Sequence, residues 1–318
     1  MYFGERGLLK RVFSAVMFIL LLTSMLTLAF NIQAVNAQGG TIYIRADGSI
    51  DPPTAPISTF DNVTYTLTGD IFNDSIWIER DNIVVDGAGY MVENGIRLSD
   101  RINVTIKNMT TQSISLNHYS NYNTISGNNI TSNWGLGYLS VTNSRNNTIC
   151  GNNITNSGGG IQLYNSEGNS ISGNNIIANS AWGISFSYYS SNNTIYGNNI
   201  KNNFNGIGFD SSSNNNTIYY NNFINNTYHQ VSSEEGSTNI WDNGREGNYW
   251  SDYNGTDANH DGIGDTPYII DANNTDHYPL MVQYVIPEFP TFLVLPLFMI
   301  ATLLAIVVYK RRILSRAL

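Results

Sequence analysis

An acidic loop near the C-terminal end of the chain has the residue types and the spacing of a calcium site. Its ligands would be, in order, Asp257, Asn259, Asp261, the carbonyl of Ile263, and Asp265. Oxygen side chains at positions 1, 3, 5 and 9, with glycine at position 6, match the first part of an EF-hand-type loop. Tyr268 stands where that loop places its bidentate glutamate. We expect a structural calcium site of modest affinity, and the alternative is an acidic turn that binds no ion.

Tyrosines recur through the middle of the chain, where they could bind a ligand. The candidates are Tyr164, Tyr188, Tyr189, Tyr196 and Tyr219. In a repeated fold these side chains would face outward from neighbouring repeats, and a row of exposed rings can stack on sugar rings. The alternative is that like residues in neighbouring strands stack only on one another.

Groups for catalysis are sparse in the same region. Between residues 103 and 230 the only acidic residues are Glu167 and Asp210, which belong to repeats that are not adjacent. Polysaccharide lyases and hydrolases need paired carboxylates or basic residues around a cleft. The sequence therefore favours a protein without catalytic activity. A polysaccharide lyase or hydrolase that uses Asp86, Arg97 or Asp100 is the alternative.

The composition argues against one class of partner. Only 12% of the residues are charged, and residues 38–285 hold 22 acidic residues but only eight basic ones. Such a surface repels a phosphate backbone, so we expect no nucleic acid partner. The single cysteine, Cys150, excludes an internal disulfide framework.

A repeated octapeptide indicates how these residues are positioned. The pattern NTISGNNI begins at residue 123 and returns in related form at residues 147, 169, 193 and 216. Weaker copies begin at residues 103 and 82, so seven repeats of about 20 to 24 residues are visible. A fixed period of this length is typical of stacked units that bury their apolar side chains against their neighbours.

The repeat predicts an all-β fold, a right-handed single-stranded parallel β-helix with three short strands per turn. Turns would stack about 4.8 Å apart, so equivalent residues form rows. One inner row would be Ile125, Ile149, Ile171, Ile195 and Ile218, and another Ile130, Ile154, Ile176, Ile200 and Phe223. A ladder of hydrogen-bonded amides at a bend would be Asn129, Asn153, Asn175, Asn199 and Asn222. The alternative, a disordered Asn-rich tract, lacks regular apolar rows.

The two ends of the chain indicate where the protein is located. We expect a signal peptide at 1–37, an N-terminal β cap at 38–80, β-helix repeats at 81–230, a C-terminal cap with the acidic loop at 231–285, and a membrane segment at 286–318. The first part combines basic residues, an apolar run and small residues, with an uncleaved anchor as the alternative. Near the other end, residues 291–309 are long enough to cross a bilayer, and basic residues follow. The body would then be exported and the tail cytosolic.

Residues 286–318 resemble an archaeal PEF-type C-terminal sorting signal. The motif is present as Pro287, Glu288 and Phe289, followed by the apolar run and the basic cluster. The resemblance implies processing by a membrane-embedded sorting peptidase, an archaeosortase. The protein would stay at the outer face of the cell membrane, through a single-pass anchor or after processing and lipid attachment. An ordinary tail anchor is the alternative.

The repeats, followed by GNYWSDY at 247–253, the acidic loop and DHYPL at 276–280, resemble the NosD family over roughly residues 80–280. They are also similar to carbohydrate-binding and sugar-hydrolysis β-helix domains. The NosD resemblance implies an exported accessory factor, associated with an ABC transporter and with copper-site assembly in nitrous-oxide reductase. Copper binding needs clustered soft or imidazole ligands. The donors here have no close motif spacing: His118, His229, His260, His277, Met91, Met109, Met281 and Cys150.

These observations predict an exported, membrane-tethered protein of the cell surface that is not an enzyme. It would bind a glycan or a partner in the cell envelope, or serve as structural display. Two alternatives stay open at this point. The first is a NosD-like copper accessory factor, and the second is a polysaccharide-active enzyme.

Overall fold

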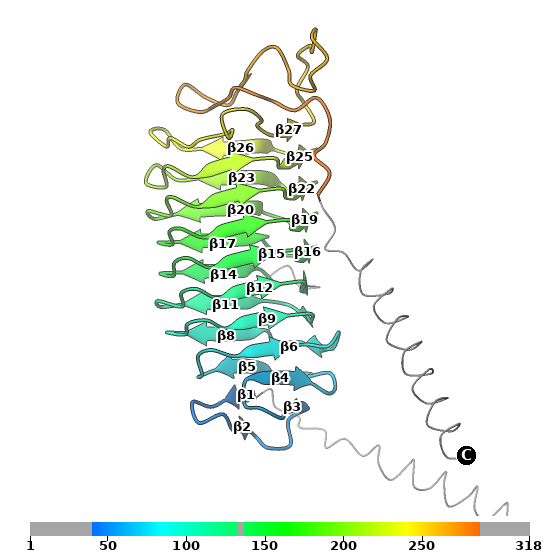
Figure 1. Ribbon diagram of the computed structural model, residues 1–318, viewed down its shortest axis with the longest axis vertical. Coiled ribbons are helices and arrows are strands. Elements are labelled where there is room, and N and C mark those ends of the chain that lie inside the picture. Colours follow the sequence, from blue (N-terminus) through cyan, green and yellow to red (C-terminus); the bar gives the residue numbers. More distant parts are fainter. Residues whose placement is uncertain (1–39, 133–136, 287–318) are drawn as a thin grey trace, which may run out of the picture. The chain divides into compact units, whose positions relative to one another are not determined.

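Three parallel sheets, here named A, B and C, run along the part of the chain that the structure describes (Figure 1). This computed structural model describes residues 40–132 and 137–286. Each turn of the chain adds one short strand to sheet B, then one to sheet C, then one to sheet A. The predicted all-β parallel solenoid is thereby confirmed, and the described ranges contain no helix.

Sheet A contains β1 (Thr41–Ile44), β2 (Ile50–Asp51), β5 (Ser75–Ile78), β8 (Ile96–Ser99), β11 (Ile114–Asn117), β14 (Leu139–Thr142), β17 (Ile161–Tyr164), β20 (Trp182–Ser187), β23 (Asn205–Phe209) and β26 (His229–Ser233). Sheet B contains β3 (Ile57–Thr59), β4 (Thr64–Leu67), β6 (Val84–Asp86), β9 (Thr105–Lys107), β12 (Thr124–Ser126), β15 (Thr148–Cys150), β18 (Ser170–Ser172), β21 (Thr194–Tyr196) and β24 (Thr217–Tyr219). Sheet C contains β7 (Met91–Val92), β10 (Thr110–Thr111), β13 (Asn129–Thr131), β16 (Asn153–Thr155), β19 (Asn175–Ile177), β22 (Asn199–Lys201), β25 (Asn222–Ile224) and β27 (Tyr249–Trp250).

Some predictions fall on residues that the structure does not describe. The signal peptide at 1–37, the apolar run at 291–309 and the sorting motif Pro287, Glu288 and Phe289 all lie outside the described residues. Within 40–132 and 137–286, no helix has the length and apolar character needed to span a membrane.

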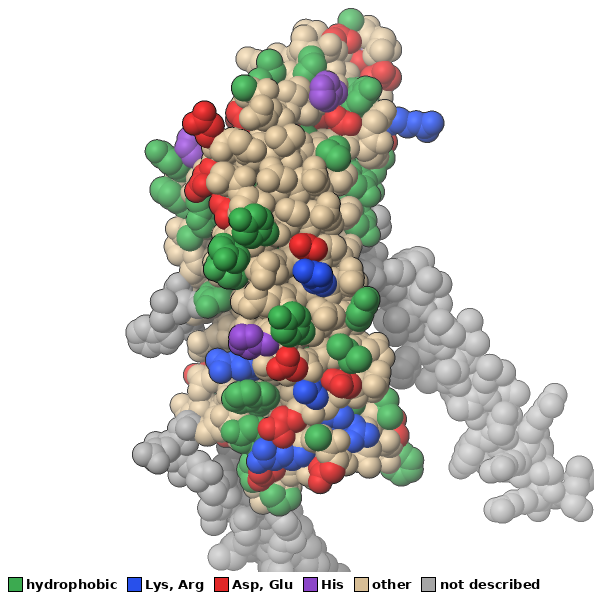
Figure 2. Space-filling model, turned by 90° about the vertical axis from the view of Figure 1, so that its left-hand side faces the viewer, with side chains coloured by type: hydrophobic (Ala, Val, Ile, Leu, Met, Phe, Trp, Pro, Cys, Tyr) green, Lys and Arg blue, Asp and Glu red, His purple; other side chains and the backbone are tan. Residues whose placement is uncertain are grey.

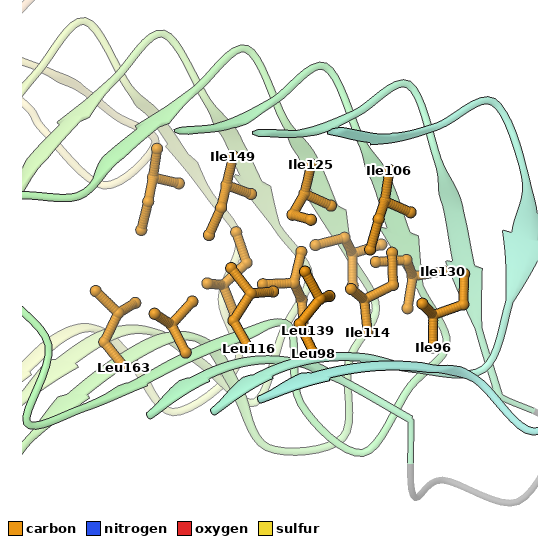
Figure 3. Packing of buried hydrophobic residues seen from close by; sticks show 14 of the residues in the cluster. Ile96, Leu98, Ile106, Ile114, Leu116, Ile125, Ile130, Leu139, Ile149 and Leu163 are labelled. Carbon is orange, nitrogen blue, oxygen red and sulfur yellow. The ribbon is translucent and has the colours of Figure 1, made fainter. Parts of the chain in front are cut away.

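The apolar core is built from rows of side chains that alternate along each strand. Both predicted inner rows are confirmed, because Ile125 in sheet B, Ile130 in sheet C and their equivalents in the following turns are fully buried. Sheet A contributes buried side chains such as Leu116 and Leu163, which face these rows across the interior (Figure 3). Since parallel register places like residues directly above one another, each turn buries its apolar face only against its neighbours.

Buried asparagines form two long ladders at corners of the solenoid, and a shorter third ladder consists of Asn179, Asn203 and Asn226. The first consists of Asn128, Asn152, Asn174, Asn198, Asn221 and Asn248, and the second of Asn123, Asn147, Asn169, Asn193, Asn216 and Asn239. Within each ladder an amide oxygen accepts hydrogen bonds from both the backbone N–H and the side-chain amide of the preceding turn, as Asn198 does from Asn174 at 2.9 Å each. The ladders therefore satisfy the backbone where the sheets end.

The predicted asparagine row lies one residue away from the first ladder and is not at a bend. Asn129, Asn153, Asn175, Asn199 and Asn222 are the first residues of successive sheet C strands. Because side chains alternate, the inward direction of Ile130 forces Asn129 outward and Asn128 inward. The outward amides still pair in part, since Asn153 donates to Asn129 at 2.9 Å and Asn199 donates to Asn175 at 3.0 Å. At the bend, the residue in the left-handed conformation is the glycine that directly precedes a ladder asparagine in the sequence, for example Gly173 with φ 63°.

The two ends of the described solenoid are closed differently. Near the N-terminal end, β1 pairs in parallel with β5, while β2 and β3 add antiparallel strands at the first edges of sheets A and B. Pairing of this kind covers an edge that would otherwise be open. At the other end Trp241 and Trp250 are buried over the last turn, and β28 (Tyr268–Ile269) pairs with β29 (Thr275–Asp276).

Candidate functional site

One straight column of outward side chains runs along the outer face of sheet A. The register aligns Tyr43, Trp77, Arg97, Ser115, Ser140, Gln162, Ser185, Gly208 and Ser232 on successive strands. Most of these residues carry hydroxyl or amide groups, and Arg97 is the only charged residue among them. The column therefore offers hydrogen-bond donors and acceptors at a spacing of about 4.8 Å per turn.

Flat aromatic rings lie on the same face. The ring of Trp182 covers the backbone of Gly208, because a Cβ added at Gly208 would lie 2.3 Å from that ring. Toward the N-terminal end, the ring of Trp77 stacks with Tyr43 at a centroid distance of 6.1 Å. The guanidinium of Arg97 lies 5.6 Å above the Trp77 ring. The face thus combines ring surfaces with polar groups, which is the usual chemistry of a binding cleft.

Three hollows follow this face from one end to the other. The first, of about 180 Å³, is lined by Trp77, Arg97 and Ser115 among others. The second, of about 260 Å³, is lined by Tyr138, Gln162, Trp182 and Ser185. The third, of about 450 Å³, is lined by Tyr228, His229, Asp252 and Tyr268. Because all three border the strands of sheet A where they begin, an elongated ligand could contact them in sequence.

The predicted tyrosines form two separate clusters. Tyr164, the last residue of β17, faces outward from sheet A and stacks on Tyr188 at 5.0 Å. Tyr189 lies edge-on to Tyr188 at 5.3 Å, and both belong to the turn between sheets A and B. Figure 2 shows the face formed by the turns between these sheets, where basic and acidic side chains gather together over the lower turns, while the charged side chains of the upper part are mostly acidic. Tyr196 and Tyr219 stack at 5.6 Å on sheet B. The structure therefore does not bring the five rings together into one row.

The second cluster receives a segment of the chain itself, which we name the strap (residues 281–286). The backbone N–H of Tyr284 donates to Asn222 Oδ1 at 2.8 Å, and Asn222 Nδ2 donates to the carbonyl of Tyr284 at 2.9 Å. The ring of Tyr284 stacks on Tyr220 at 4.5 Å, and Tyr220 contacts Tyr219. Past this point the strap runs along the corner between sheets B and C toward Gly197 and earlier turns (Figure 1). The rings of this cluster thus pack against the chain's own C-terminal segment.

Replacing Asn222 by alanine should release the strap. The substitution removes both hydrogen bonds to the peptide of Tyr284, each worth about 1 kcal/mol, so we expect the Tyr284 amide to exchange with deuterium about thirtyfold faster. Hydrogen exchange read by mass spectrometry measures this directly. Asn175→Ala, which removes an outward amide of the same row without touching the strap, is the matched control. Equal exchange rates in the two variants would contradict the assigned clamp.

The acidic loop is stabilised by its own backbone. Asp257 accepts hydrogen bonds from the N–H groups of Asp261 and Gly262, at 3.2 and 2.9 Å. Asp261 accepts from the N–H of Ile263 at 2.9 Å and from Asn259 Nδ2 at 3.0 Å. Asp265 instead accepts from Ala258 N at 2.9 Å. Among the described residues no three His, Cys, Asp or Glu side chains converge as metal ligands.

The potential copper donors do not converge either. His277 Nδ1 lies 3.1 Å from Asp242 Oδ2, and His229 packs on the ring of Tyr228. Met109 is buried in the core, where its thioether is inaccessible. Burial raises the pKa of the Cys150 thiol, which disfavours the thiolate that binds copper. Soft and imidazole ligands must surround one ion, so the donor set in the described residues does not fit a copper site.

The carboxylates considered for catalysis stabilise turns. Glu167 lies 3.8 Å from the guanidinium of Arg145. Burial alone would raise the pKa of Asp210, but hydrogen bonds from the backbone of Tyr188 and from neighbouring serines hold that pKa below its ordinary value. Asp86 pairs with Lys107 at 3.1 Å. These contacts give each carboxylate a structural role. They do not decide whether the protein is catalytic.

Trp77 and Gln162 were not among the residues predicted from the sequence. Their column contains serine in four turns and a different residue type in each of the other five, so its aromatic and amide groups show no period. The sequence could have indicated Gln162 through the alternation of inward and outward side chains along a strand. Gln162 lies between the buried residues Ile161 and Leu163 and must therefore face outward.

No curated protein matches the sequence. A solved structure of the periplasmic alginate epimerase AlgG shares 19% identity with the chain at a TM-score of 0.41, covering 50% of this chain and 47% of the epimerase. A structure of the same epimerase with a single substitution gives 18% identity, a TM-score of 0.40 and coverage of 50% and 48%. The chain therefore spans about half the length of these structures, and the likeness is weak.

The sequence also matches a protein family, described as "Periplasmic copper-binding protein (NosD)". The matches cover residues 36–211 and 75–255, and therefore extend over both the regular repeats and the start of the C-terminal cap. They include all of the strands that carry the column on sheet A. Because the matched residues make up more than half of the sequence, the chain belongs to the NosD family.

Proposed function

We propose that this protein is an exported, membrane-tethered scaffold of the cell surface that binds an extended glycan along the outer face of sheet A. The family description as periplasmic supports export, and the sequence supports the tether through its apolar C-terminal run. The sorting peptidase that the Pro287-Glu288-Phe289 motif implies would act on this tail. The scaffold holds the polysaccharide without cleaving it.

The observation that carries this proposal is the pairing of flat rings with a column of hydroxyl and amide groups. A pyranose has apolar faces that pack on an aromatic ring and a rim of hydroxyls that bond to Ser, Gln and Asn. Trp182 lines the same hollow as Gln162 and Ser185, so one sugar unit can contact all three. Neighbouring turns are about 4.8 Å apart, and one sugar unit is longer than this spacing. One unit therefore contacts column residues from two neighbouring strands.

Electrostatics favours a glycan of low charge at the centre of this face. Ser115, Ser140, Gln162 and Ser185 are uncharged, and the described body is acidic overall. A polyanion would be repelled from most of the surface. Arg97 is the one cation of the column, so an acidic sugar would be accommodated only at the N-terminal end.

Replacing Trp182 by alanine is expected to weaken glycan binding at least tenfold, because the sugar loses its stacking surface. Titration calorimetry of the full chain with neutral and uronic-acid hexasaccharides would measure this. Tyr189→Ala, on the turns between sheets A and B, is the matched control and should leave the affinity unchanged. Weaker binding in the Tyr189 variant alone would move the site to that other face and refute the assignment to sheet A.

Copper handling is the second candidate function, since the family is described as copper-binding. The described donors do not fit such a site, so we expect no tight, stoichiometric copper(I) binding by this chain. A polysaccharide-active enzyme is the other alternative, and release of shortened or unsaturated products from the bound hexasaccharides would establish it. Either positive result would displace the scaffold proposal.

The calcium site rests on the spacing of the acidic loop. If the loop binds calcium, adding the ion after chelation raises the midpoint of thermal unfolding, by the linkage between binding and folding. We expect a rise of a few degrees at about 1 mM calcium, within the range of extracellular modules. Asp261→Ala should abolish it. An unchanged midpoint in the unsubstituted chain would mean that the hydrogen bonds within the loop are sufficient without an ion.

A further inference from the structure

The residue that lies two positions before each sheet B strand, from β4 onward, adopts the left-handed conformation. These residues are Asn62, Asn82, Asn103, Tyr122, Asn146, Gly168, Asn192 and Asn215, with φ between 54° and 65°. They therefore occupy equivalent positions. In five of them the backbone N–H donates to the carbonyl of the residue just before the counterpart in the next turn, whereas the N–H of Asn62 donates to Thr59 Oγ1 within the β3–β4 hairpin. Examples are Asn146 to Glu167 and Asn192 to Asn214, both at 3.2 Å.

Five of these eight residues begin an Asn-x-Thr sequence, the acceptor sequence of N-glycosylation. They are Asn62, Asn103, Asn146, Asn192 and Asn215. Each asparagine is exposed, and the threonine two residues later is the first residue of a sheet B strand and faces outward. We name these five the corner sequons. In the last three, the residue between Asn and Thr is a buried member of the second asparagine ladder.

Three of the corner sequons differ from those of sheet C in what their amides do, whereas the amide of Asn103 donates to Asn82 Oδ1 at 2.9 Å. Asn129 and Asn153 lie inside strands that are paired on both sides, and the amide of Asn153 donates to Asn129 at 2.9 Å. The side-chain amides of Asn146, Asn192 and Asn215 make no hydrogen bond to another described residue. A glycan on one of these amides would project into solvent and would cost the fold no hydrogen bond.

We propose that the corner sequons at Asn146, Asn192 and Asn215 are N-glycosylation sites and that the sequons of sheet C are not. In this reaction the Nδ2 atom of asparagine attacks C1 of the sugar in a polyprenyl-diphosphate-linked oligosaccharide. The N–C1 bond forms as the bond from C1 to the diphosphate oxygen breaks, the diphosphate lipid leaves, and Nδ2 loses one proton. The assignment rests on the proposed export of the body, because the donor and the transferase act on exported chains.

The distance between neighbouring corner sequons determines which of them can carry a glycan on the same molecule. Asn146 and Asn192 lie two turns apart, which is about 10 Å along the axis and leaves room for a glycan on each. Asn215 lies only one turn, about 5 Å, beyond Asn192. Two oligosaccharides do not fit side by side at that distance, so one molecule carries a glycan at Asn192 or at Asn215 but not at both.

The test uses the folded full chain in detergent micelles, incubated with an oligosaccharyltransferase and its polyprenyl-diphosphate-linked oligosaccharide. Mass spectrometry of intact glycopeptides then gives the occupancy of each sequon. We expect modification at Asn146 and at one of Asn192 and Asn215, with Asn129 and Asn153 unmodified. Thr148→Ala should remove the glycan at Asn146 alone and leave the midpoint of thermal unfolding unchanged.

A flexible sequon appended to the N-terminus of the same chain is the internal control. Modification of the appended sequon without Asn146, Asn192 or Asn215, or modification of Asn129 or Asn153 in preference to the corner, would overturn the assignment. Protease treatment of intact cells separates this result from the proposed location. If the body is protected from protease inside intact cells, the proposed export is wrong, and the chain is then not modified in the cell either. The experiment with the purified transferase does not depend on export, and it tests only whether the corner sequons are the preferred acceptors.

Discussion

Replacing Asn174 by alanine is expected to lower the free energy of unfolding by about 4 kcal/mol. The Asn174 amide donates to the carbonyl of Ile149 and to Asn198 Oδ1, both at 2.9 Å. Its oxygen accepts from the backbone N–H and the side-chain amide of Asn152, both at 3.0 Å. Alanine leaves these buried groups without partners, and each unsatisfied group costs about 1 to 3 kcal/mol.

Asn175→Ala is the control, because it removes the same side chain one residue further along. Asn175 is exposed and faces outward from sheet C, so we expect a loss of less than about 1 kcal/mol. Chemical unfolding of both variants, followed by circular dichroism, measures the difference. Equal losses in the two variants would show that the inner and outer amides contribute alike, and the energetic role of the buried ladder would be rejected.

This pair of asparagines shows what could be predicted from the sequence. The period, the strands and both inner rows follow from the spacing of isoleucine, since a residue that recurs every turn must stack on itself in a parallel solenoid. The position of the ladder required a further step. In the sequence Gly-Asn-Asn-Ile both asparagines recur equally, and only alternation from the inward isoleucine assigns the first to the interior.

The candidate site was harder to predict, for a physical reason. A repeat reveals positions that every turn needs, and these are positions of the scaffold. The proposed binding face of sheet A is formed by residues that vary from turn to turn, such as Trp77, Gln162 and Trp182, so it leaves no period. The tyrosine pair at 196 and 219 did repeat, and the contact of Tyr284 with Tyr220 beside it depends on a segment more than 60 residues away. A local sequence pattern does not indicate that a distant segment of the chain folds back onto these residues.

The first asparagine ladder ends on a carboxylate, and this gives the second large prediction. Asp276 is completely buried, and its Oδ2 accepts from Asn248 N and Trp250 Nε1, both at 2.8 Å. Its Oδ1 accepts from Tyr278 N at 3.0 Å. Burial raises the pKa of Asp276 to about 6, against the opposing effect of these hydrogen bonds. The last rung of the ladder is therefore an acid that titrates near neutral pH.

The folded state then holds a proton on Asp276 between about pH 4 and pH 6, where the unfolded chain has already lost it. The contribution of this group to stability is fully present below pH 4 and is lost as the pH rises to 6. A shift of about two pH units corresponds to about 3 kcal/mol. Asp276→Asn cannot titrate, so the stability of the unsubstituted protein relative to this variant should fall by that amount between pH 4 and pH 7. Chemical unfolding at each pH measures it, and the other carboxylates cancel because both proteins contain them. Parallel stability profiles would mean that the three N–H donors keep Asp276 ionised throughout, and that the ladder ends on a permanent charge.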